Sequence, residues 1–259
     1  MVRLQSASRV LLASARHGHG LVGVSGIGHK RQLWFQEERG GRLLQTEVVI
    51  ADGTLHLEHS LRQTPYLNFM FKKLRGYGEP SGCRVLVLGV GGGLLPQALV
   101  KSGCKVIAVE SSEVVLSLAR KFMGLQAETL ELHSCDAASF VRSLAERLSP
   151  DSQRFDACAI DIFQGHTSAV PAFTRSQSFL QDLKQILRPG ALLLQNAVDA
   201  TSSLKCSRSG ASGESGAHVR CTARVRQAAP MGPLKPVTYV RQNEDLKLLK
   251  DAYREAGVL

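Results

Sequence analysis

The stretch RVLVLGVGGGLLPQALVKSGCKVIAVESSE, residues 84–113, decides the fold. Its apolar run 85–88 is typical of a strand that is buried on both faces, and this run leads directly into a glycine-rich turn. A helix is predicted over 94–102, followed by a second strand over 105–109 that ends at Glu110. The stretch therefore predicts a β-α-β unit with a ligand site at the carboxyl ends of its strands.

The glycine-rich turn and Glu110 together favour a nucleoside-type ligand. Glycines let a ligand approach the backbone, and the first N–H groups of the following helix are unpaired donors. A carboxylate about 20 residues further on can accept from both hydroxyls of a ribose. The turn runs from Gly89 through Gly91 to Gly93, whereas the dinucleotide fingerprint needs its third glycine where this chain has Leu94. Alone, such a turn is as consistent with a structural role as with ligand binding, but the strand, helix and carboxylate around it favour the ligand.

The elements that follow extend this unit into a sheet. Strands are predicted over 130–133, 155–160 and 191–195, and helices over 112–123, 137–148 and 171–187. Strands that alternate with helices predict an α/β fold with a doubly wound, mostly parallel sheet. Ahead of the unit, extended runs around the pair Asp52-Gly53 predict a small N-terminal β element, and a helix over 61–74 follows it.

Composition and pattern divide the chain into five parts. Residues 1–31 carry basic side chains and no acidic one, which is typical of a transit peptide and equally of a disordered basic leader. Residues 201–236 are rich in Ser, Gly and Arg, and we expect them to be flexible. The core is expected over 81–200 after a β-hairpin and helix over 32–80, and a short strand and a helix are expected over 237–259.

The net charge of +10 does not indicate a nucleic-acid partner. Residues 1–35 hold five basic and no acidic side chains, residues 201–241 hold seven basic and one acidic, and residues 242–259 hold three basic and four acidic. These parts account for the whole net charge, so that 36–200 is neutral. No apolar run reaches the length of about 18 residues that a membrane-spanning helix needs. The six cysteines form no C-x-x-C pair, so neither a metal site nor a disulfide framework is predicted. We expect a cytoplasmic protein, or a mitochondrial one if the leader directs import.

Five motifs follow one another along the chain: VLVLGVGGG at 85–93, Glu110, DA at 136–137, FDACAID at 155–161 and LRPGALLLQN at 187–196. They resemble the successive motifs of the class I S-adenosylmethionine-dependent methyltransferases, which have a Rossmann-like fold. The resemblance is greatest to the spermidine-synthase-like subgroup, and within it to the lysine and N-terminal methyltransferases of elongation factor 1A. It covers about 32–199. The family completes its sheet with a sixth and a seventh strand, and this chain offers a candidate for only one of them, at 237–240. The C-terminal end is therefore atypical, and it either folds in an unrecognised way or is incomplete.

The resemblance implies S-adenosyl-L-methionine as the cofactor. Gly89 and Gly91 would pass under its methionine part, Glu110 would hold the ribose hydroxyls, and Ser111 would lie near the adenine. Asp136 would meet the adenine edge, although a cap on the helix that follows is an equally good use of this side chain. The implied cofactor-binding residues are Gly89, Val90, Gly91, Gly93, Glu110, Ser111, Asp136, Ala137 and Asp161.

The expected reaction is methyl transfer to an amine of a protein, a lysine or an N-terminus, with a translation factor as partner by resemblance only. Asp161 is the catalytic candidate, because a carboxylate can accept the proton of the amine, and Gln164 and His166 are weaker candidates. An aminopropyl transferase is an alternative, but the run Asp161-Ile162-Phe163-Gln164 lacks the second acid of the polyamine synthases. A catalytically inactive scaffold that binds a protein partner is the other alternative.

Overall fold

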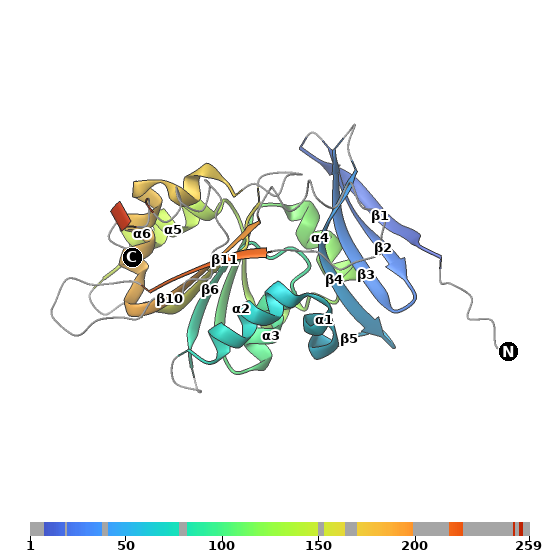
Figure 1. The fold of residues 1–259 in the computed structure, drawn as a ribbon, viewed down its shortest axis with the longest axis horizontal. Helices are drawn as coiled ribbons and strands as arrows, with labels where there is room; N and C mark the ends of the chain where they lie inside the picture. Colours follow the sequence, from blue (N-terminus) through green and yellow to red (C-terminus); the bar gives the residue numbers. More distant parts are fainter. Residues whose placement is uncertain are drawn as a thin grey trace.

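A computed structural model describes residues 8–18, 20–37, 41–77, 82–149, 153–163, 170–198 and 218–224, together with Asp251, Arg254 and Glu255. These residues form two β-sheets, with helices packed around the larger one (Figure 1). The smaller sheet is N-terminal and is drawn in blue in Figure 1. It lies beside the larger sheet and its helices.

The larger sheet has six strands in the order β11-β10-β9-β6-β7-β8. The five strands from β10 to β8 are parallel, and β11 pairs antiparallel with β10. The chain runs outward from β6 in one direction and then returns to its other side, so the carboxyl ends of β6 and β9 form a switch point of the kind that binds ligands. The strands are β6 (Arg84–Leu88), β7 (Lys105–Glu110), β8 (Glu131–Ser134), β9 (Phe155–Ile160), β10 (Leu187–Val198) and β11 (His218–Arg224).

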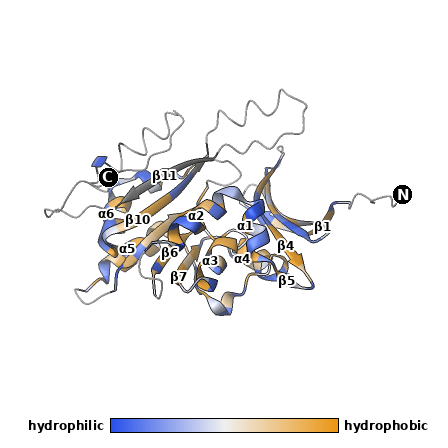
Figure 2. Ribbon diagram, turned by 60° about the horizontal axis from the view of Figure 1, so that its bottom comes forward, coloured by the Kyte–Doolittle hydropathy of each residue, from blue (hydrophilic) through white to orange (hydrophobic). Residues whose placement is uncertain are grey.

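Helices cover both faces of this sheet. They are α1 (Leu57–Gln63), α2 (Pro65–Arg75), α3 (Leu94–Lys101), α4 (Glu113–Phe122), α5 (Ala137–Glu146) and α6 (Gln177–Ile186), with the 3-10 turns η1 (Ala127–Thr129) and η2 (Ala172–Arg175). Val85 and Val87 of β6 face the core shared with α2, α3 and α4, whereas Leu86 and Leu88 face α5 and α6. The helices have apolar and polar sides (Figure 2). Within the described part of the chain, no helix is long and apolar enough to cross a bilayer.

The smaller sheet is an antiparallel meander of five strands. They are β1 (Val10–His17), β2 (Gly20–Ile27), β3 (Lys30–Glu37), β4 (Arg42–Ala51) and β5 (Thr54–Leu55). Val22, Val24, Leu33 and Val48 are fully buried and belong to the same apolar core as Val85 of the larger sheet. The two sheets therefore share one core on this side of the molecule.

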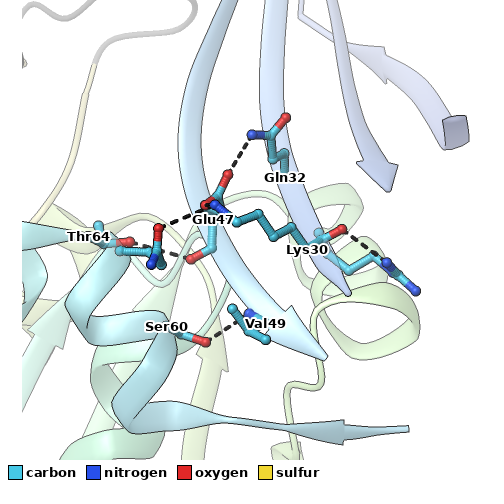
Figure 3. Close-up of polar contacts among 8 residues, drawn as sticks. Lys30, Gln32, Glu47, Val49, Ser60 and Thr64 are labelled. Atoms are coloured by element: carbon cyan, nitrogen blue, oxygen red, sulfur yellow. Dashed lines mark hydrogen bonds and ion pairs between the residues drawn. The ribbon is translucent and has the colours of Figure 1, made fainter. Parts of the chain in front are cut away.

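A polar cluster joins β4 to β3 and to α1 (Figure 3). The carboxylate of Glu47 accepts hydrogen bonds from Gln32 Nε2 at 2.6 Å and from Lys30 Nζ at 2.7 Å. The hydroxyl of Ser60 accepts a hydrogen bond from Val49 N at 2.8 Å. These contacts fix β4 against its neighbours, and β4 supplies side chains to the site described below.

The predicted β-α-β unit and doubly wound sheet are confirmed. Between residues 84 and 160 every predicted strand and helix is present, with ends within two residues of the expected positions. The helix predicted over 171–187 is instead η2 followed by α6, because Ser176 begins a new helix by accepting a hydrogen bond from Phe179 N at 3.3 Å. The helix predicted over 61–74 is likewise divided, because Pro65 starts α2 and has no N–H to continue α1.

The structure corrects two expectations about the ends of the chain. Residues 10–17 and 20–27, which we assigned to a leader, form β1 and β2. Their apolar residues recur with the period of two that strands need, but small residues lie among them and weaken the signal. Residues 218–224, inside the part expected to be flexible, form β11. The strand expected at 237–240 lies outside the described residues, as does most of the helix expected after it.

Candidate active site

A cavity lies between the carboxyl ends of the parallel strands and the N-terminal sheet. Its volume is about 150 Å³. One wall follows the ends of β6, β7, β8 and β9, and it consists of Gly89, Gly91, Val109, Glu110, Ser111, Ser112, Val115, Asp136, Ala137, Asp161, Ile162, Phe163 and Phe173. The opposite wall comes from the N-terminal sheet and α2, and it consists of His17, Phe35, Gln45, Thr46 and Tyr66.

The glycine turn after β6 brings the ends of three strands together. Gly89 N donates to Val109 O at 2.8 Å, and Asp161 N donates to Leu88 O at 2.8 Å. Gly89 has a φ of 90°, and a Cβ atom there would collide with the carbonyl group of Asp161. Only glycine fits at this position, and its small size lets Asp161 lie against the turn.

Glu110, at the end of β7, holds the turn in place. Its Oε2 accepts hydrogen bonds from Val90 N at 3.1 Å and Gly91 N at 3.2 Å, and its Oε1 accepts one from Ser112 N at 3.1 Å. A carboxylate offers about four acceptor positions. The three N–H groups therefore orient the carboxylate and leave capacity for a further donor in the cavity.

Ser112 and Asp136 cap the two helices that begin at the cavity. Ser112 Oγ accepts a hydrogen bond from Val115 N at 3.2 Å in α4, and Asp136 Oδ1 accepts one from Ser139 N at 2.8 Å in α5. Each cap satisfies an N–H group that has no partner inside its helix. The capping role that we considered for Asp136 is thus present, and the same side chain also lines the cavity.

Asp161 lies at the tip of β9 in a network with Asn196 and Tyr66. Asn196 Nδ2 donates to Asp161 Oδ1 at 2.8 Å, and the Tyr66 hydroxyl also hydrogen-bonds to this carboxylate. Burial and, to a smaller extent, the charge of Glu110 raise the pKa of Asp161 to about 6, against the lowering effect of the two hydrogen bonds. Burial and the charge of Asp161 raise the pKa of Tyr66 well above its ordinary value, so its hydroxyl keeps its proton. Asp161 is therefore ionised at pH 7 and able to accept a proton near neutrality.

The N-terminal sheet touches the glycine turn and α4 directly. Thr46 Oγ1 accepts a hydrogen bond from Gly92 N at 3.4 Å. His17 Nδ1 lies 3.0 Å from Ser112 Oγ, and its ring packs against Phe35 with 5.2 Å between the centroids. These contacts make the sheet a wall of the cavity.

None of the side chains of that wall was predicted from the sequence. They lie far from the motifs along the chain, and only tertiary packing brings them to the strand ends. One signal could have identified Thr46, because it shares the inward face of β4 with the fully buried Val48. A polar residue on an apolar strand face is unusual enough to mark a site.

The structure places seven of the nine expected cofactor-binding residues on the cavity wall. Val90 and Gly93 are not among the residues that line it: Val90 is 7% exposed, and Gly93, with a φ of 79°, is the N-cap residue of α3. Gln164 and His166 lie outside the described residues. Among the residues that the structure describes, no group of three or more His, Cys, Asp or Glu side chains could hold a metal ion.

A parallel sheet of this order, with a glycine turn after its first strand and an acid after its second, is a Rossmann-like arrangement that binds nucleosides and nucleotides. Residues 86–194 match the family model described as a methyltransferase domain. The match runs from β6 to β10, the part of the chain that carries the glycine turn, Glu110 and Asp161.

Known proteins similar to this chain include methyltransferases and an aminopropyl transferase. The human eEF1A lysine and N-terminal methyltransferase is 34% identical over 122 residues, which are 44% of this chain and 17% of that protein. The polyamine aminopropyltransferase of Vibrio vulnificus is 25% identical over 186 residues, which are 68% of this chain and 60% of that protein. The chain thus spans less than two thirds of either relative.

Two solved structures share the fold. A crystal structure of human methyltransferase-like protein 13 in complex with SAH has a TM-score of 0.51 at 22% identity, over 74% of this chain and 91% of that chain. A probable spermidine synthase from Corynebacterium glutamicum has a TM-score of 0.53 at 17% identity, over 75% of this chain and 66% of that chain. At these identities the likeness shows the fold alone.

Proposed function

We propose that this chain binds S-adenosyl-L-methionine and transfers its methyl group to an amine of a protein, either a lysine side chain or an N-terminus. The observation that carries the proposal is the position of Asp161, which lines the same cavity as Glu110 and the glycine turn. The similarity to the eEF1A lysine and N-terminal methyltransferase supports a protein amine as the acceptor. A protein substrate is therefore the partner that we propose.

The residues present fit the cofactor. Glu110 has acceptor capacity for a ribose hydroxyl, and Gly89 and Gly91 line the cavity with backbone atoms that a ligand can approach. Ser111 and Ala137 lie on the wall where the adenine is expected. Glu110 would hold the ribose, and the glycine turn would pass under the methionine part.

The cofactor, when bound, supplies a methyl group on a positively charged sulfur that is already a good leaving group. The protein has to exclude water and orient the amine, and good orientation contributes roughly 7 to 11 kcal/mol. Asp161 would steer the amine by accepting a hydrogen bond from it and would take up its proton. Tyr66 and Asn196 would hold the carboxylate in place meanwhile.

In the part of the chain that the structure describes, the side chain that holds Asp161 has an unpaired acceptor atom. Oδ1 of Asn196 is buried and has no hydrogen-bond partner among the described residues, while Nδ2 of the same side chain donates to Asp161. A buried acceptor without a donor costs free energy. Such a cost is consistent with a functional role for this side chain, which is to orient Asp161.

Aminopropyl transfer is the second candidate, because the similarity to the polyamine aminopropyltransferase favours it. A cationic diamine needs acids along its length, however, and the residues after Asp161 that line the cavity are Ile162 and Phe163. We therefore place methyl transfer first.

The test is incubation of the purified chain with S-adenosylmethionine labelled in its methyl group and a cell lysate. We expect one or a few labelled polypeptides, and a loss of labelling of at least about 100-fold in Asp161→Asn. A parallel reaction with decarboxylated cofactor and putrescine should give no product. Equal labelling by Asp161→Asn would contradict the role of Asp161, and formation of spermidine would favour the second candidate.

Binding of S-adenosylhomocysteine, measured by calorimetry on the same preparation, tests the cofactor site separately. We expect binding by both the unchanged chain and Asp161→Asn. Folded protein that does not bind it would contradict the proposal and favour an inactive scaffold.

A further inference from the structure

Cys83 and Cys104 lie at the ends of β6 and β7 that point away from the cavity. Arg84 is the register partner of Lys105, and Lys105 N donates to Cys83 O at 2.9 Å, so the pairing continues back to the two cysteines. Neighbouring strands are about 4.8 Å apart. This spacing lies within the Cα separation of roughly 4.4 to 6.8 Å that a disulfide requires.

The two thiols also point to the same side of the sheet. Cys83 precedes Val85 by two positions and Cys104 precedes Val106 by two positions, and all four side chains belong to the same apolar core. The thiol groups are in hydrogen-bond contact with each other, and both cysteines are in the free form. The register and the shared face therefore place the two thiols side by side, in the arrangement that a disulfide requires.

We propose that Cys83 and Cys104 form a reversible intramolecular disulfide in the native protein, with Cys104 as the attacking thiol. Cys104 is half-buried and can be reached from solvent, whereas Cys83 is only 6% exposed. Ser102 Oγ lies 3.7 Å from Cys104 Sγ.

The hydrogen bond from Cys83 lowers the pKa of Cys104, and Ser102 acts in the same direction. The same contact raises the pKa of Cys83. A thiolate is the reactive form of cysteine, so the pair consists of an accessible nucleophile and a protected resolving thiol.

The oxidant in this proposal is a low-molecular-weight disulfide such as glutathione disulfide, which accepts the two electrons of the protein thiols. The Cys104 thiolate attacks one sulfur of glutathione disulfide, forms a mixed disulfide and releases one glutathione thiolate. Cys83 then loses its proton and attacks the Cys104 sulfur, which releases the second glutathione. Two protein thiols are oxidised to a disulfide, and one glutathione disulfide is reduced to two glutathione molecules.

This pairing does not follow from the sequence, where 20 residues separate the two cysteines and no C-x-x-C motif is present. It follows from the register of β6 and β7. Transient disulfides of this kind occur in reducing compartments as well.

The test equilibrates the full chain under native conditions in buffers that range from reduced to oxidised glutathione. The free thiols are then blocked by alkylation, and tryptic peptides are analysed by mass spectrometry. Cleavage after Arg75, Arg84, Lys101 and Lys105 places the two cysteines on peptides 76–84 and 102–105. We expect these peptides to become linked in oxidising buffers and to separate again with dithiothreitol. Separate alkylated peptides in every buffer would overturn the proposal.

Two variants test the assignment of roles. Cys83→Ala should leave Cys104 with a bound glutathione, because no resolving thiol is present. Cys135→Ala removes another half-buried thiol at the end of β8 and should keep the cross-link. Circular dichroism would check that both variants fold. A folded Cys83→Ala variant without the glutathione adduct would contradict Cys104 as the attacking thiol.

Discussion

The hydroxyl of Tyr66 has one proton and two acceptors within reach, the Asp161 carboxylate and the Gln45 carbonyl oxygen, which is 3.3 Å away. When Asp161 is ionised, a charge-assisted hydrogen bond to it is the stronger of the two. When Asp161 is protonated, that advantage is lost, and the Tyr66 proton can turn to Gln45. Tyr66 is therefore a positioning residue that favours the ionised form of Asp161.

The substitution Tyr66→Phe removes this hydrogen bond and should raise the pKa of Asp161. Hydrogen bonds to charged groups contribute about 1.5 to 3 kcal/mol, so we expect the midpoint to move from near pH 6 to about pH 7 or higher. The measurement is an NMR titration of carboxyl carbons in protein labelled at aspartate. Tyr77→Phe is the control, because the Tyr77 ring lies beside the Arg188 guanidinium at the other end of the sheet. A lower midpoint in Tyr66→Phe would contradict the role given to this hydroxyl.

The substitution Glu110→Gln should weaken S-adenosylhomocysteine binding by about 10- to 100-fold. A glutamine has one acceptor oxygen in place of two and would turn its NH2 group toward N–H donors that now face Glu110. Calorimetry measures the affinity. Glu113→Gln, an exposed position in the first turn of α4, is the matched control, and equal affinities in the two variants would exclude a special role for Glu110.

At the scale of elements, the parallel sheet could be predicted because each of its strands is a short apolar run buried on both faces. Once the strands are known, the acidic residues that end them are predicted to lie at the edge of the sheet where ligands bind. Glu110 and Asp161 were identified in this way. The second wall could not be predicted, because it depends on where β1 and β4 pack in three dimensions. The strand period shows that a strand forms but does not show which sheet it faces.

Packing of β4 against the glycine turn gives a prediction for Gly92. A Cβ atom at this position would lie 2.9 Å from Thr46 Cγ2 and 3.1 Å from Met123 Cε. Gly92→Ala should therefore push the sheet away and lower the free energy of unfolding by about 1 to 3 kcal/mol. Gly41→Ala, where a Cβ atom meets nothing within 4 Å, should change it far less. Urea unfolding compares the two variants, and equal stabilities would show that the turn and β4 do not pack closely.

At the scale of the whole molecule, the N-terminal sheet is part of the core and not a separate appendage. A chain that starts at residue 32 would lack β1 and β2, including the fully buried Val22 and Val24. We expect it to lose more than about 3 kcal/mol of stability and to bind S-adenosylhomocysteine weakly. A chain that starts at residue 8 keeps all five strands and should behave like the full chain. Full binding by the shorter chain would contradict this role of the sheet.

The same arrangement bears on the leader that we predicted. If residues near the N-terminus direct import into mitochondria, proteolytic processing has to stop before Val10 to leave β1 intact. Import thus stays a prediction, tested by the location of a fluorescent fusion and by the N-terminus of the mature chain.

Because the cavity takes one wall from each sheet, a molecule bound inside it would contact both sheets and hold them together. Thermodynamic linkage then requires that occupancy oppose separation of the two layers, by about 2.7 kcal/mol at a ligand concentration 100 times its Kd. Amide hydrogen exchange in β1 to β4 should slow on saturation with S-adenosylhomocysteine, although these strands lie far in sequence from the motifs that identify the domain. Ligand binding and the packing of the first 50 residues against the larger sheet would then be thermodynamically coupled, so that each favours the other.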